Sequence, residues 1–168
     1  MFEAWLHFAT IIFVQALLFV VCAYRQKRLS DMPRILGWGI FTGIGVGLLS
    51  DLIWGKFFGL WSYTLGFGVL SLTLTAALVY GLFAANILLM RRVRLLHFFI
   101  WIMVMMATYE VTNHFFRVWT YELALPTYAF LMFLVAGYFA TAFFIAVIWH
   151  AFLGYRFSLI DNLLRSKV

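Results

Sequence analysis

The sequence predicts an all-α integral membrane protein with five transmembrane helices, on the strength of three observations. Hydrophobic residues make up 66% of the 168 residues and charged residues only 11%, with a mean hydropathy of +1.02. Soluble domains contain about 45–50% apolar and about 25% charged residues, so the excess apolar surface must face lipid. Apolar stretches long enough to cross a bilayer recur five times, and basic residues gather in the connections between them. This pattern excludes a secreted disulfide scaffold, a disordered tail, a cytosolic enzyme and a nucleic-acid-binding domain.

Each predicted span holds roughly the 20 apolar residues that a helix needs, at ~1.5 Å of rise per residue, to cross the hydrocarbon core. The spans are 4–23, 33–54, 67–90, 95–115 and 126–153, so residues 1–153 form one transmembrane domain. The first span has no small-residue cleavage site after it, and Glu3 is the only charge ahead of Arg25. We therefore expect it to remain as an anchor and not to be removed as a signal peptide.

Lysine and arginine are divided unequally between the two sets of connections. One set contains Arg25, Lys27, Arg28, Arg34, Arg91, Arg92, Arg94, Arg156, Arg165 and Lys167, and the other contains only Lys56 and Arg117. Cytoplasmic connections carry such an excess, so we expect the N-terminus outside and the C-terminus in the cytoplasm of a multi-pass inner-membrane protein. Short juxtamembrane clusters of this kind attract anionic lipid headgroups, so the pI of 9.8 does not indicate a nucleic-acid partner.

Small residues recur every four positions on two of the predicted spans. The predicted helix-packing residues are Gly39, Gly43 and Gly47 on the second span and Ala77, Gly81 and Ala85 on the third. Such a stripe lets a second helix approach closely, which replaces the hydrophobic effect as the source of association inside lipid. The stripes predict either packing within the chain or self-association into a homo-oligomer.

The last residues, 154–168, alternate apolar and polar side chains at helical spacing. This spacing predicts a short amphipathic helix that lies on the cytoplasmic leaflet.

The most informative pattern is an internal repeat with an offset of 58 residues. The matched pairs are Trp61 with Trp119, Tyr63 with Tyr121, Leu65 with Leu123 and Tyr80 with Tyr138, and Asp51 matches Glu110 with one residue of slack. Each unit contains two spans, so the two copies have the same orientation in the membrane and form a parallel repeat.

The repeat places an acid and an aromatic motif twice at the outer end of the bundle. Asp51 and Glu110 are the candidate catalytic residues, because a carboxyl near a span end is costly to ionise unless it is wet or paired, and can stay protonated to donate a proton. Asn113 follows Glu110 by one helical turn and is expected to orient it. The candidate ligand-binding residues are Trp61, Tyr63, Asn113, Trp119, Tyr121 and Glu122. The alternative is an interfacial aromatic belt with snorkelling acids.

An acid that ends a helix, a short glycine-containing loop and Trp-x-Tyr, preceded by the basic stretch 24–34, together resemble the membrane domain of small bacterial and archaeal lycopene cyclases. The resemblance covers about residues 24–90. In that family Pro-x-Glu-Glu follows the aromatic motif, whereas this chain has Leu-Gly-Phe-Gly-Val-Leu-Ser at 65–71 and Leu-Pro-Thr-Tyr at 125–128. The resemblance implies a cavity for an isoprenoid and acid-triggered carbocation chemistry, which would fall to Asp51 or Glu110.

The leading prediction is therefore a membrane protein that binds, and modifies as a cyclase-like isomerase, a carotenoid-like or other isoprenoid lipid, with no metal and no cofactor. Two alternatives stay open. One is a non-catalytic subunit or assembly factor of a larger respiratory or photosynthetic complex. The other is a haem-binding electron carrier, since haem-binding bundles use histidine pairs. The histidines are His7, His97, His114 and His150, which we expect to lie at the membrane interfaces.

Overall fold

The computed structural model describes residues 2–63, 69–90, 93–152, 154–158 and 160, with side chains for 5–62, 78–90, 93–152, 154–158 and 160. The chain is almost entirely helical. Its elements are α1 (Phe2–Arg25), the 3-10 turn η1 (Leu29–Asp31), α2 (Met32–Ser50), the π-helix η2 (Asp51–Phe57), β1 (Trp61–Tyr63), α3 (Val69–Leu89), α4 (Leu95–Phe116), β2 (Trp119–Tyr121) and α5 (Thr127–Phe152).

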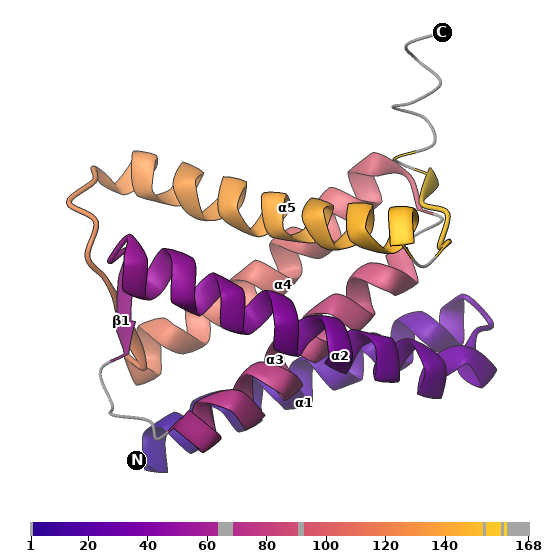
Figure 1. Cartoon of the computed structure of the whole chain (residues 1–168), viewed down its shortest axis with the longest axis horizontal. Coiled ribbons are helices and arrows are strands. Elements are labelled where there is room, and N and C mark those ends of the chain that lie inside the picture. Colours follow the sequence, from indigo (N-terminus) through magenta and orange to yellow (C-terminus); the bar gives the residue numbers. More distant parts are fainter. Residues whose placement is uncertain (1, 64–68, 91–92, 153, 159, 161–168) are drawn as a thin grey trace, which may run out of the picture.

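Four helical segments are long and apolar enough to cross a membrane, as expected of a membrane protein. They are Trp5–Arg25, Leu29–Phe57, Leu95–Phe116 and Thr127–Phe152. Within α3, the stretch Leu78–Leu89 is a shorter apolar segment. The five helices α1 to α5 begin and end within a few residues of the predicted spans. In Figure 1, β1 lies at one end of the bundle and the connection from α1 to α2 lies at the opposite end.

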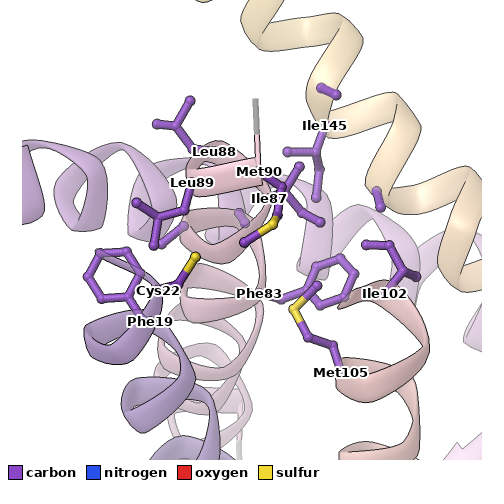
Figure 2. Packing of buried hydrophobic residues seen from close by; sticks show 14 of the residues in the cluster. Phe19, Cys22, Phe83, Ile87, Leu88, Leu89, Met90, Ile102, Met105 and Ile145 are labelled. Carbon is purple, nitrogen blue, oxygen red and sulfur yellow. The ribbon is translucent and has the colours of Figure 1, made fainter. Parts of the chain in front are cut away.

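The C-terminal half of α3 is the centre of the core. Every residue from 81 to 90 is buried, and α3 contacts α1, α2 and α5. Because other helices pack around this segment, its apolar side chains on all sides of the helix are covered by protein. Figure 2 shows this part of the core, where Leu89 of α3 lies beside Phe19 of α1. Phe83 and Ile87 lie on the other side of α3, toward Ile102 of α4 and Ile145 of α5.

The glycine stripe of α2 faces α3 inside the same chain. A methyl group added at Gly39 would lie 2.6 Å from the carbonyl oxygen of Gly81 and 2.7 Å from Cβ of Ala85. One added at Gly43 would overlap the backbone of Gly81, and one added at Gly47 would overlap the ring of Tyr80. The two backbones are therefore in direct contact, and this face of α2 is not available to a second copy. The side chain of Ala77 lies outside the described residues.

Two buried polar contacts connect helices that are distant in sequence. Asn86 of α3 donates from Nδ2 to both the backbone carbonyl and Oε1 of Gln15 in α1, each at 3.2 Å. Trp149 of α5 donates from Nε1 to the hydroxyl of Thr42 in α2 at 2.8 Å. A polar side chain inside a membrane bundle is costly unless it has such a partner, so these contacts favour one arrangement of the helices.

The chain after α5 turns back onto the bundle. Phe157 is 1% exposed and Ile160 is 7% exposed, so both belong to the core. Residues 154–157 are not helical, and residues 161–168 lie outside the described residues, so the amphipathic tail helix remains a prediction.

Candidate functional site

The two Trp-x-Tyr motifs pair with each other. β1 and β2 form an antiparallel two-stranded ribbon in which Trp61 lies opposite Tyr121, Ser62 opposite Thr120 and Tyr63 opposite Trp119. The register is symmetric about its centre, where the hydroxyls of Ser62 and Thr120 are 3.1 Å apart. The sequence predicts two separate loops here, and the structure joins them into one element.

The ribbon has a polar face and an aromatic face, because side chains alternate along a strand. Ser62, Thr120 and Glu122 are exposed, and Ser62 donates a hydrogen bond of 2.7 Å to Glu122. Trp61, Trp119 and Tyr121 are half-buried against the helices. Glu122, predicted to bind a ligand, therefore lies on the outer face of the ribbon, and the side chain of Tyr63 lies outside the described residues.

Asn113 holds the start of β2 in place. Its side-chain oxygen accepts hydrogen bonds from the amides of Val118 and Trp119, both at 3.0 Å, and its nitrogen donates to the carbonyl of Trp119 at 3.0 Å. The turn that it stabilises contains Arg117, which has a left-handed backbone with φ of 50°. Asn113 thus positions the strand, which differs from the predicted role of orienting Glu110.

Glu110 accepts two hydrogen bonds from phenols. The hydroxyls of Tyr121 in β2 and Tyr138 in α5 both donate to its Oε1 at 2.8 Å. Glu110 is half-buried near the C-terminal end of α4, on the aromatic side of the ribbon, where Tyr121 reaches it. The arrangement connects α4, β2 and α5 at a single carboxyl group.

Asp51 has a tyrosine partner of the same kind. It is 8% exposed, and its Oδ1 accepts a hydrogen bond from the hydroxyl of Tyr80 in α3 at 3.4 Å. Tyr80 and Tyr138 are one of the pairs at the predicted offset of 58, and each donates to one of the two matched acids.

The π-helix η2 accounts for the residue of slack in the repeat. Gly59 has a left-handed backbone with φ of 61° and matches Arg117 at the offset of 58. From Asp51 to Gly59 there is one residue more than from Glu110 to Arg117. A π-turn holds one residue more than an α-turn, and η2 begins at Asp51. The π-helix therefore accommodates the extra residue, and a left-handed residue still precedes β1 as Arg117 precedes β2.

Tyr109 connects the two acid–tyrosine pairs. Its hydroxyl donates to the carbonyl of Val79 at 3.0 Å, next to Tyr80, and its ring lies 5.8 Å from that of Tyr138 between centroids. None of the three tyrosines Tyr80, Tyr109 and Tyr138 was predicted as a site residue. The shared offset of Tyr80 and Tyr138 was the available signal, but nothing in the spacing showed that their hydroxyls reach the acids.

His7, near the start of α1, is fully buried among aromatic side chains of the same chain. Its ring centroid lies 5.0 Å from that of Trp119, 5.1 Å from that of Phe8 and 5.9 Å from that of Phe116. The start of β2 and the end of α4 cover this part of α1 and exclude the histidine from the surface. His97 and His114 are exposed, and His150 is half-buried. Among the side chains described, no three from histidine, cysteine, aspartate or glutamate come together as potential metal ligands.

Comparison with protein-family models, curated proteins and solved structures gives no match to this chain. The resemblance to lycopene cyclases therefore stays a prediction from the residues that carry it.

Proposed function

We propose that this protein binds a carotenoid-like or other isoprenoid lipid at the ribbon end of the bundle and isomerises it by acid catalysis. The observation that carries the proposal is the acid–tyrosine contact that occurs twice, at Asp51 with Tyr80 and at Glu110 with Tyr138. An interfacial aromatic belt needs tyrosines near the headgroups, but it does not need their hydroxyls to converge on carboxyl groups.

The two contacts belong to a parallel duplication of a helix–strand–helix unit. Support comes from four matched features: the left-handed residue before the strand, the strand itself, the tyrosine on the following helix and the acid on the preceding helix. The symmetric register of β1 with β2 is what a two-fold axis between the copies would produce. The duplication gives the site two acids at one end of the bundle.

In the proposed orientation, the end of the bundle that holds the ribbon lies outside the cytoplasm. Around the opposite end lie Arg25, Lys27, Arg28, Arg34, Arg94 and Arg156, whereas the ribbon end has Lys56 and Arg117. The positive-inside rule then places the N-terminus outside and the site in the outer half of an inner membrane.

The chemistry follows from the groups at the site. A protonated carboxyl transfers its proton to an alkene carbon of the isoprenoid and leaves a carbocation. Faces of Trp and Tyr rings stabilise a nearby cation. A neighbouring double bond then attacks the cationic carbon to close a ring, and a proton is lost to a carboxylate. The product is an isomer of the substrate, so the step needs no oxidant or reductant.

Expression in bacteria that accumulate lycopene tests the proposal. Extracts are separated by chromatography, and cyclised products are identified by their shorter-wavelength absorption. The wild type should convert lycopene, and Glu110→Gln or Asp51→Asn should lower conversion by at least about a hundredfold, the usual contribution of a general acid. The matched control is Asp31→Asn, an exposed acid at the other end that pairs with Arg28 at 3.2 Å.

A second comparison uses the tyrosines. Tyr138→Phe removes one hydroxyl from Glu110 and should reduce conversion, whereas Tyr128→Phe changes a side chain that is 73% exposed and should not. Full activity in both acid variants would refute the catalytic proposal. An absorption spectrum of the purified protein, before and after dithionite, separates the haem alternative: a Soret band that shifts on reduction would refute the isoprenoid site.

A further inference from the structure

Three arginines from three different elements are brought to one short segment at the end of the bundle opposite the ribbon. Arg34 lies in the first turn of α2, Arg94 immediately precedes α4, and Arg156 follows α5. All three are exposed. The segment that gathers them is 154–158, the turn that folds back from α5.

Tyr155 holds Arg34 at this segment. The guanidinium carbon of Arg34 lies 5.8 Å from the centroid of the Tyr155 ring, within the range of a cation–π contact. The Tyr155 ring in turn packs on Trp149, with centroids 6.5 Å apart, and its amide donates to the carbonyl of Trp149 at 3.1 Å. Trp149 is fully buried, so the platform under Arg34 is anchored in the core.

Ser158 brings Arg94 to the same place. The hydroxyl of Ser158 donates to the carbonyl of Val93 at 3.1 Å, and Arg94 is the next residue. Phe157 is buried beside this contact, while Arg156, the residue before it, is exposed. The turn thus fixes both the chain before α4 and the position of Arg156.

The three positive charges have no acidic partner in the part of the chain that the structure describes. The acid described at this end is Asp31, and its carboxylate is already bound to Arg28 at 3.2 Å. Like charges near one another repel, and an anion bound between them would relieve that repulsion. Guanidinium groups match the oxygens of phosphate in geometry and charge.

We infer that Arg34, Arg94 and Arg156 form a binding site for the phosphate of an anionic phospholipid. Leu95 and Leu96 directly follow Arg94 and are 55% and 64% exposed, so apolar surface for an acyl chain lies beside the charges. A soluble phosphate would make no use of that surface. The site is independent of the proposed reaction, because it lies at the other end of the bundle from both acids.

Thermal unfolding of the purified full-length protein in mild detergent, titrated with phosphatidylglycerol or phosphatidylcholine, tests the site. Phosphatidylglycerol should raise Tm and phosphatidylcholine should not. A hydrogen bond from a charged group contributes about tenfold or more in affinity, so Arg34→Gln with Arg94→Gln should weaken the phosphatidylglycerol response by about a hundredfold or more. The matched control, Arg25→Gln with Lys27→Gln, removes the same charge from the same end but away from 154–158, and should retain most of the response.

Three outcomes overturn the inference. Equal Tm increases with both lipids would show that charge is not recognised. Equal losses in the two double variants would show diffuse attraction in place of a site. An equal Tm increase with inorganic phosphate alone would assign the arginines to a soluble anion. Arg34→Lys with Arg94→Lys keeps the charge, so it separates a loss of the guanidinium contacts from a loss of folding.

Discussion

The contact between α2 and α3 allows two glycines of one helix to be compared directly. A methyl group added at Gly43 would lie 2.6 Å from the backbone carbonyl carbon of Tyr80 and would overlap the backbone of Gly81. One added at Gly45, two residues away, meets nothing within 4 Å. Both residues lie inside α2, so alanine gains the same helix propensity at each position. The comparison of Gly43→Ala with Gly45→Ala therefore isolates the approach of the two helices.

The magnitude follows from the distances. An ordinary carbon–carbon contact is about 3.5–4.0 Å, so the helices must separate by about 1 Å at Gly43, and a gap of that size forfeits up to about half of the dispersion energy of the contacts it opens. Overpacking of this kind costs about 1–3 kcal/mol, and it is opposed by about 1 kcal/mol of helix propensity. At Gly45 only the propensity acts and should stabilise the protein by about 0.5–1 kcal/mol.

The measurement is thermal unfolding of both variants in the same detergent. The two variants differ by the overpacking cost of about 1–3 kcal/mol, and about 1 kcal/mol moves Tm by about 2–4 °C for a protein of this size. Gly43→Ala should therefore unfold about 2–12 °C below Gly45→Ala. Equal Tm values would refute the reasoning, because they would mean that the stripe does not form the contact with α3.

Three further substitutions test other contacts. Asn86→Leu leaves the side chain of Gln15 buried without its donor and should destabilise the fold by about 1–2 kcal/mol in thermal unfolding, whereas no change would mean that the pair forms no bond. Trp149→Phe removes the hydrogen bond to Thr42 and should lower the free energy of unfolding by about 1–2 kcal/mol. The loss should be smaller in a Thr42→Val background, where the acceptor is already absent, and equal losses in the two backgrounds would contradict the contact. Asn113→Ala should speed hydrogen exchange at the first amides of β2 while α5 stays protected, and unchanged exchange in β2 would show that another group holds the strand.

The sequence was sufficient for the helical class and for the helix positions because both depend on local composition. A stretch such as 126–153 has one stable conformation in lipid, and α5 begins and ends within a residue of it. The glycine spacing likewise identified a flat face of α2, although spacing alone left open whether the partner was α3 or a second copy.

The contacts of the site depended on tertiary structure and could not be predicted. The repeat identified Asp51 and Glu110 as matched, but the hydroxyl of Tyr138 reaches Glu110 only because α5 returns beside α4. The pairing of β1 with β2 joins segments 58 residues apart, and neither segment has the length or the turn residues of an ordinary hairpin. The burial of His7 could not be predicted for the same reason, because the Trp119 ring that packs against it is far away in sequence.

The ribbon also sets an order on the assembly of the protein in its membrane. β1 and β2 lie in different connections at the same end of the bundle, so in the proposed orientation their segments cross the bilayer separately and pair only after both have crossed. Until α4 has been inserted, β1 has no strand to pair with and its backbone groups must be satisfied by water. Closure of the ribbon therefore requires α4 to be in place, and a chain arrested before β2 would present an unpaired strand edge at β1.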